Sequence, residues 1–98
     1  MKDQILIFSG TTEGRMLSQV LAENGIYCTV CVATEYGETI MPQMDKVTVH
    51  KGRMNVEEML KFTEENEFAA VVDATHPFAT AVSENIRESL IDTKIPYI

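Results

Sequence analysis

The sequence lacks any apolar run close to the roughly 20 residues that a membrane-spanning helix needs. Its first residues contain only the short apolar stretch 5–8, whereas the core of a secretory signal peptide takes roughly 7–15 residues. No small-residue cleavage site follows that stretch. These absences argue against a membrane span and a signal peptide, and they predict a cytoplasmic protein.

Positive charge is scarce. The 98 residues include 8 Lys and Arg against 15 Asp and Glu, a formal net charge of −7. A nucleic-acid surface neutralises phosphates with an excess of clustered Lys and Arg, so we expect no nucleic-acid partner. The length and the 45% apolar content are those of one small globular domain.

Cysteine is scarce as well. Cys28 and Cys31 have C-x-x-C spacing, but they lie in the apolar run 27–33, which is typical of a buried strand. Residues three apart on a strand face opposite sides, and neither a turn nor a second Cys pair is present to build a zinc or redox site. We therefore expect two buried thiols and no metal site.

The remaining pattern alternates strands with helices. Two helices show apolar residues at helical spacing, with Met16, Leu17, Val20 and Leu21 in the first and Met59, Leu60 and Phe62 in the second. Asn55 and Glu58 have the spacing of a capping box that opens the second helix. The expected strands are residues 4–8, 27–33, 46–50 and 68–73 with a fifth beginning at 95–98, and the expected helices are 13–24, 55–66 and 78–91, with one helical turn around 38–41.

This alternation predicts an α/β fold, a Rossmann-like doubly wound parallel sheet of about five strands in a three-layer α/β/α arrangement. In such sheets, ligands bind beyond the carboxyl ends of the strands. That rule selects residues 9–15, 34–37, 50–53 and 73–77 as candidate ligand-binding segments.

Residues 9–15 (SGTTEGR) occupy the place of a dinucleotide phosphate loop. The G-x-G-x-x-G fingerprint is incomplete, because Thr12 stands at the second glycine position and only Gly10 and Gly14 remain. Free N–H groups at the helix start, two hydroxyls and Arg15 are nevertheless donors that suit a phosphate. The alternative is an ordinary Thr-capped helix in which Gly14 allows close packing on the sheet.

Charged residues follow the second and third expected strands. Glu35 lies roughly where an acidic residue would accept the ribose 2′-OH of NAD, although a solvated loop carboxylate explains it as well. Lys51 and Arg53, beside His50, place cations at the expected ligand edge, as Arg15 does, which would favour an anionic ligand. Simple solvated charge near a helix start is the alternative.

Residues 73–78 (DATHPF) are the most unusual segment. Asp73 ends an apolar strand, and Thr75 and His76 then supply a hydroxyl and a base whose pKa can be tuned. Pro77 suits the first turn of the helix that follows. His76 is either a functional base or a structural histidine, and we interpret Ser83 and its polar neighbours on the next helix as surface residues.

Four motifs together carry a family resemblance. They are residues 7–15 (IFSGTTEGR), 32–37 (VATEYG), 52–53 (GR) followed by Glu58 and Met59, and 71–79 (VVDATHPFA) with Ser83 and Asn85. In this order and spacing the chain resembles the amino-terminal part of the precorrin-6A and cobalt-precorrin-6A reductases of cobalamin biosynthesis.

The resemblance implies NADPH as cofactor and hydride transfer to one double bond of a corrin precursor, a polyanionic macrocycle. It also implies that Glu35 is a loop residue. His76 would be catalytic, and Lys51, Arg53 and His76 would contact the substrate. The implied cofactor-binding residues are Ser9, Gly10, Thr11, Thr12, Glu13, Gly14, Arg15, Gly52, Arg53, Thr75, His76 and Pro77.

Members of this family are longer and have a second domain. We therefore expect residues 1–98 to form the NADPH-binding domain of a larger reductase, and to be inactive alone. A short fifth strand would leave a sheet edge open to self-association. A stand-alone nucleotide- or partner-binding module without catalytic activity is the alternative.

Overall fold

The computed structural model describes residues 4–9, 12–33, 44–52, 54–75, 80–91, 93 and 95–98. Within them, four strands form one sheet in the order β3-β2-β1-β4, and every neighbouring pair is parallel. The strands are β1 (Gln4–Ser9), β2 (Cys28–Val32), β3 (Val47–Lys51) and β4 (Phe68–Ala74). The predicted α/β class with a doubly wound parallel sheet is confirmed.

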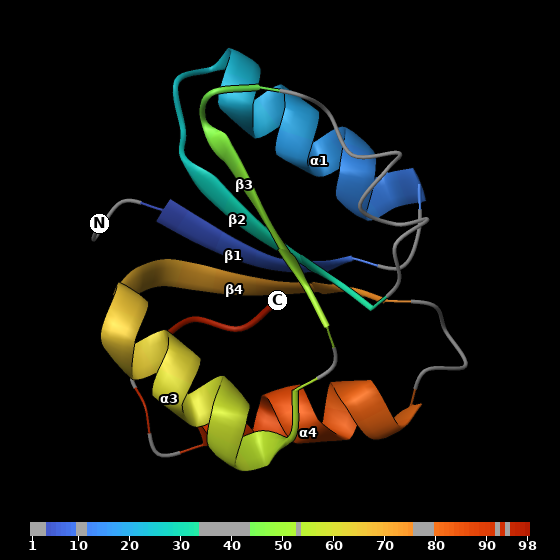
Figure 1. Ribbon diagram of the computed structural model, residues 1–98, viewed down its shortest axis with the longest axis vertical. Coiled ribbons are helices and arrows are strands. Elements are labelled where there is room, and N and C mark those ends of the chain that lie inside the picture. The colour runs from blue at the N-terminus through green and yellow to red at the C-terminus, as the bar shows by residue number, and fades with distance from the viewer. Residues whose placement is uncertain are drawn as a thin grey trace.

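Helices cover both faces of this sheet, as Figure 1 shows. α1 (Thr12–Glu23) lies on one face, and α3 (Val56–Asn66) and α4 (Thr80–Leu90) lie on the other. The predicted capping box opens α3: Asn55 Oδ1 accepts from the Glu58 N–H at 2.8 Å, and the Asn55 N–H donates to Glu58 Oε1 at 3.0 Å. None of the helices in the described ranges has the length and apolar character to cross a bilayer.

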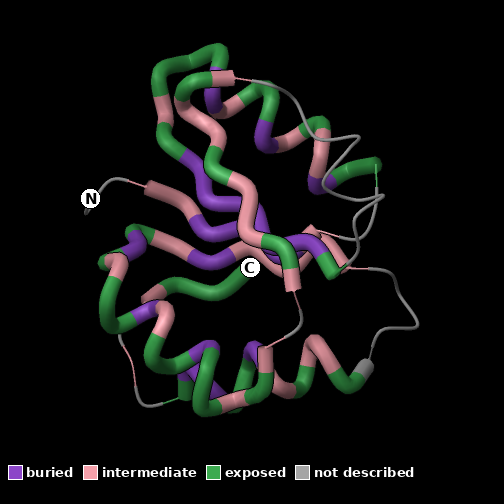
Figure 2. Tube along the Cα trace, in the orientation of Figure 1, coloured by how far each residue is buried: buried purple, intermediate pink, exposed green. Residues whose placement is uncertain are grey.

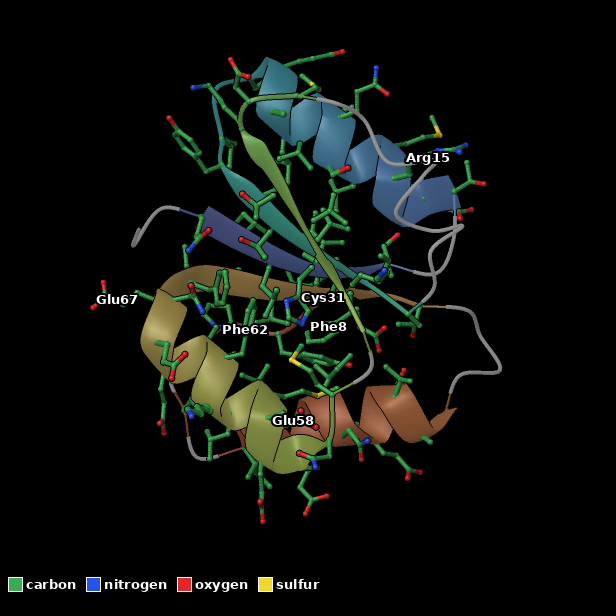
Figure 3. The ribbon with its side chains drawn as sticks, in the orientation of Figure 1. Phe8, Arg15, Cys31, Glu58, Phe62 and Glu67 are labelled. Atoms are coloured by element: carbon green, nitrogen blue, oxygen red, sulfur yellow. The ribbon has the colours of Figure 1, made fainter. Side chains whose placement is uncertain are left out.

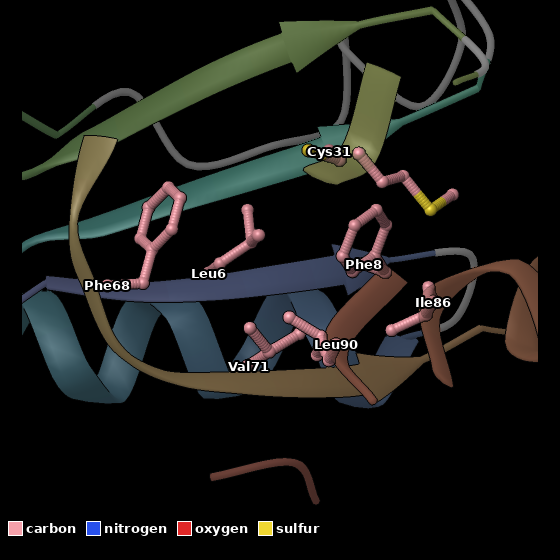
Figure 4. Close-up of a cluster of buried hydrophobic side chains, with 8 residues drawn as sticks. Leu6, Phe8, Cys31, Phe68, Val71, Ile86 and Leu90 are labelled. Carbon is pink, nitrogen blue, oxygen red and sulfur yellow. The ribbon is translucent and has the colours of Figure 1, made fainter. Parts of the chain in front are cut away.

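The apolar core is divided by the sheet into two clusters. All five residues of β2 are buried, as a strand covered on both faces requires. Figure 2 shows the buried residues concentrated in the strands and on the inward sides of the helices. The α1 side contains Ile7, Cys28, Val30 and Val32, and the α3–α4 side (Figure 4) contains Leu6, Phe8, Cys31, Met59, Phe68, Val71, Ile86 and Leu90.

The predicted apolar face of α1 is wrong in part. Met16 and Val20 are 58% and 51% exposed, while Gly14, Ser18 and Ala22 are the buried positions. Small side chains bring the helix close to the sheet, and Ser18 can face inward because its Oγ donates to the Arg15 carbonyl at 2.7 Å.

A similar correction applies to α3. Leu60 is exposed, whereas Thr63 is buried and its Oγ1 donates to the Leu60 carbonyl at 2.8 Å. A hydroxyl that bonds to its own helix needs no partner in the core, so a polar residue can occupy an inward position.

The expected fifth strand is present as a short segment beside the outer side of β4, where Tyr97 forms a parallel bridge with Val71. The Val71 N–H donates to the Pro96 carbonyl, and the Ile98 N–H donates to the Val71 carbonyl, both at 2.9 Å. This segment extends the sheet beyond β4. Self-association at the new edge stays a prediction.

Both cysteines are buried and unpaired, on opposite faces of the sheet, as predicted. Burial raises the pKa of the Cys31 thiol to about 12 and also raises that of Cys28. Because the thiolate is the reactive form, we expect a thiol-reactive disulfide reagent to label neither cysteine in the native protein near neutral pH, and both after unfolding in denaturant. Rapid labelling of the native protein would contradict this burial.

Candidate functional site

The sheet order places a topological switch point between β1 and β4. From β1 the chain moves outward to β2 and β3, and then it crosses to β4 on the other side of β1. Ligands of open α/β sheets bind at the carboxyl ends of the strands near such a point. Here Ser9 is paired with Ala74, so the ends of β1 and β4 lie side by side and Thr75 follows directly.

Gly14 brings the first turn of α1 against these two strand ends. A Cβ atom placed on Gly14 would lie 2.6 Å from Ser9 Oγ and 3.0 Å from both Ser9 Cβ and Ala74 Cβ. Real Cβ atoms do not approach other atoms so closely, so only glycine fits without a shift. The last glycine of a dinucleotide-binding fingerprint has the same task of close packing between helix and strand.

The start of α1 contains further predicted site residues. Thr12 and Glu13 are exposed in the first turn, and Arg15 is half-buried on the side of the molecule where the strands end (Figure 3). Gly10 and Thr11 lie outside the described residues. N–H groups in a first helical turn have no partner within the helix, and they provide a positive end that suits an anion.

The carboxylate of Asp73 accepts four hydrogen bonds at this edge. Its Oδ1 accepts from the Thr75 N–H at 3.0 Å and from Thr75 Oγ1 at 2.5 Å. Its Oδ2 accepts from Ser83 Oγ of α4 at 2.6 Å and from Tyr97 Oη at 3.0 Å. One carboxylate thus joins β4, α4 and the segment beside β4.

These contacts shift the pKa of both ionisable partners. Burial alone would raise the pKa of the Asp73 carboxyl, but the hydrogen bonds from Ser83, Thr75 and Tyr97 outweigh it and lower the pKa below its usual value. Burial, followed by the bond to Asp73 and its charge, raises the pKa of Tyr97. Asp73 is therefore ionised, and Tyr97 is a neutral donor, at neutral pH.

The lowered pKa of Asp73 predicts a dependence of stability on acid. A group whose folded pKa is depressed stabilises the fold above its unfolded pKa, near 3.9 for Asp, and loses that contribution as pH falls through the folded value. We expect Asp73→Asn to be less stable than the parent near pH 6, with the difference shrinking below about pH 4. Denaturant unfolding of both proteins at several pH values measures this, and a constant difference would contradict it.

The end of β3 lies two strands away from β1, about 10 Å at the usual strand spacing. Gly52 has a φ of +127°, which disfavours any side chain, and its N–H donates to the Val32 carbonyl at 2.9 Å. Lys51 is exposed at this edge, and Arg53 lies outside the described residues. The structure therefore gathers Ser9, Gly14 and Thr75, and places Lys51 and Gly52 farther along the same edge.

His50 has a structural position. Its ring packs on Phe62 of α3 with the centroids 5.1 Å apart, and Phe62 stacks on Phe68 at 5.7 Å. His50 therefore faces the α3–α4 core, where Figure 3 shows Phe62.

Two residues that donate hydrogen bonds to Asp73 were not predicted from the sequence as part of the site. Ser83 was expected at the surface, but it is half-buried on Asp73, and that expectation is wrong. For Tyr97 the sequence pattern predicts only a place in the fifth strand. Both contacts join positions at least ten residues apart, for which local patterns carry no signal. Glu35, His76 and Pro77 lie outside the described residues.

The comparisons with known proteins point to one family. The protein-family model CbiJ, which describes the precorrin-6x reductases CbiJ/CobK, matches residues 4–98. The cobalt-precorrin-6A reductase of Priestia megaterium is 37% identical and that of Synechocystis sp. 32% identical, each over 96% of this chain and 36% of the relative. A precorrin-6A reductase of Sinorhizobium sp is 35% identical over 99% of this chain and 37% of that protein.

A solved structure of the CobK precorrin-6A reductase agrees in fold. It matches with a TM-score of 0.80 and 27% identity, covering 96% of this chain and 37% of that one. The chain thus spans a little over a third of the length of these relatives. The chain belongs to the precorrin-6x reductase (CbiJ/CobK) family.

Proposed function

We propose that this chain is the nucleotide-binding part of an NADPH-dependent reductase of cobalamin biosynthesis that reduces one double bond of precorrin-6A or cobalt-precorrin-6A. The observation that carries the proposal is the contact of Gly14 with the ends of β1 and β4, made in a chain that belongs to this reductase family. That contact puts the start of α1 where the phosphates of a dinucleotide bind in sheets of this kind.

The residues present fit such a cofactor. The close approach at Gly14 leaves no room for a side chain between α1 and the sheet, so the first-turn N–H groups stay at the strand ends. We assign the pyrophosphate to Ser9, Gly10, Thr11, Thr12, Glu13, Gly14 and Arg15, with Gly52 and Arg53 bordering the cofactor. Bound NADPH supplies the hydride.

The β4 side of the edge is assigned to the reacting end of the cofactor and to the macrocycle. Thr75 directly follows Ala74, the residue of β4 that pairs with Ser9, and the N–H and hydroxyl of Thr75 donate to Asp73. We assign Thr75, His76 and Pro77 to this end of the site. Lys51, Arg53 and His76 are assigned to the acidic arms of the substrate, because cations favour a polyanionic ligand.

The state of the two thiols supports a proposal about the compartment. Cys28 and Cys31 are free and buried rather than joined in a disulfide. Unpaired thiols suit a reducing environment, and we propose the cytoplasm.

A titration tests the cofactor assignment directly. Calorimetry of the chain with NADPH is expected to show saturable binding, with circular dichroism to establish that the sample is folded. A folded chain that gives no heat with NADPH, and none with NADP⁺, would overturn the assignment. A different outcome is that the chain binds the nucleotide, but the protein expressed from the complete reading frame never oxidises NADPH in the presence of precorrin-6A. The chain would then be a binding module without reductase activity.

We further propose that His76 donates a proton after the hydride has been transferred. His76→Ala, in the protein expressed from the complete reading frame, is then expected to lower turnover by about 10²-fold or more while NADPH affinity holds. Turnover is followed by the loss of NADPH absorbance, and binding by calorimetry. Unchanged turnover would remove this role.

A further inference from the structure

Four hydrogen bonds converge on the carboxylate of Asp73, which none of the cofactor or substrate assignments above uses. The donors come from three parts of the chain: Thr75 after β4, Ser83 of α4, and Tyr97 beside β4. An ionised carboxylate only accepts hydrogen bonds, so its two oxygens dictate the direction of every one of these donors.

The two oxygens have separate tasks. Oδ1 receives both donors of Thr75, its N–H and its hydroxyl, which fixes the backbone and χ1 of that residue together. Oδ2 accepts hydrogen bonds from the hydroxyls of Ser83 and Tyr97, and these two bonds hold the carboxylate itself in one orientation. Thr75 Oγ1 also lies 3.3 Å from Ser83 Oγ, so the hydroxyls form one connected group.

The position of this group gives it a role in the site. Thr75 immediately precedes the segment 76–79, and Ser83 lies in the first turns of the helix that follows it. The carboxylate therefore ties together both sides of the connection between β4 and α4. It also attaches this connection to Tyr97, which bonds through its hydroxyl to Asp73 and through its backbone bridge to Val71.

We propose that Asp73 is a positioning residue for the reduction. It accepts from both the N–H and the hydroxyl of Thr75 and so fixes this residue at the carboxyl end of β4, beside the bound ligand, while Ser83 and Tyr97 act through it by fixing the carboxylate. The lowered pKa of Asp73 agrees with a carboxylate that stays ionised during this task. The inference deepens the proposed function and rests on it for the identity of the ligand.

The physical reason for such a group is precision. A site that transfers hydride needs its contact residues held within about 0.5 Å, and a 1 Å misplacement can cost about 10²-fold in rate. A single carboxylate with one or two donors can rotate about χ2. With donors on both oxygens from three segments, rotation breaks at least two bonds at once.

Two substitutions test the proposal without removing Asp73. Ser83→Ala and Tyr97→Phe each delete one hydroxyl that holds Oδ2. In the protein from the complete reading frame, each is expected to lower kcat about tenfold while the Kd for NADPH changes less than twofold, because the phosphate contacts lie at α1. The two changes are expected to be non-additive, since both act through the same carboxylate.

The chain provides matched controls. Tyr27 is 39% exposed against 37% for Tyr97, and Ser89 lies on α4 like Ser83 but its Oγ donates to the Ile86 carbonyl of its own helix. Tyr27→Phe and Ser89→Ala are expected to leave kcat unchanged. If the controls lower kcat as much as Ser83→Ala and Tyr97→Phe, or if none of the four lowers it, the positioning role is wrong.

A second measurement does not depend on activity. Amide hydrogen exchange of Thr75 is expected to be slow in the 98-residue chain, and to accelerate about tenfold in Ser83→Ala and Tyr97→Phe but not in the two controls. A chain that fails to bind NADPH while showing this pattern would overturn the proposed function and leave Asp73 as the residue that holds Thr75. An unchanged exchange rate in all four variants would overturn the inference itself.

Discussion

Gly14→Val is expected to destabilise the protein by about 2–3 kcal/mol and to abolish binding of NADPH. The first atom of any side chain at this position meets Ser9 Oγ at 2.6 Å and the Cβ atoms of Ser9 and Ala74 at 3.0 Å. The hydroxyl can rotate away, but the two Cβ atoms are fixed on β1 and β4. The helix must therefore move off the sheet, and its first-turn N–H groups move with it.

The measurements are denaturant unfolding and calorimetric titration with NADPH. Gly14→Ala is expected to show a smaller loss of stability, because the better helix propensity of alanine offsets about 1 kcal/mol of the clash. Gln19→Val, on the exposed side of α1, is the control for placing a β-branched residue in this helix. A Gly14→Val protein with parental stability and NADPH affinity would refute both the packing argument and the phosphate assignment.

Leu6→Ala is expected to lower the free energy of unfolding by about 3 kcal/mol. Leu6 is fully buried on β1, the strand between β2 and β4, where it lies between Thr29 and Val71 in the register (Figure 4). Truncation leaves a cavity that the flanking strands cannot collapse to fill. Domains of this size are stable by roughly 5–15 kcal/mol, so the change removes a large part of the total.

Leu60→Ala is the matched control, since it makes the same chemical change at an exposed position of α3. We expect a loss below about 1 kcal/mol there. Urea unfolding followed by circular dichroism measures both variants, and similar slopes would show that the unfolded states are comparable. Equal losses at the two positions would mean that the core does not lie where the structure places it.

Much of the fold was predicted from local patterns. The continuous apolar run around Cys28 and Cys31 predicted a strand buried on both faces, and the three-residue spacing placed the two thiols on opposite sides of the sheet. The capping box of Asn55 and Glu58 predicted the start of α3. These features depend on interactions between residues within a few positions of one another, so the sequence alone is enough to predict them.

For the candidate site, the sequence predicted only its location at the edge of the sheet where the strands have their carboxyl ends. Parallel strands bring their carboxyl ends together, and so Ser9, Gly14 and Thr75 were expected near one another, as the structure places them. Roles for Arg53 and His76 came from the family resemblance and stay predictions, because both residues lie outside the described part of the chain.

By itself, the sequence determined the class of the fold, the alternation of its strands and helices, the burial of β2 and the family. Tertiary structure decided which side of α1 faces the sheet, where Ser18 lies inward and Met16 outward, and that Ser83 and Tyr97 meet on Asp73. The physical reason is distance along the chain. Hydrogen bonding and apolar periodicity act between near neighbours, whereas the partners of a side chain in the core or at a site depend on how whole elements pack.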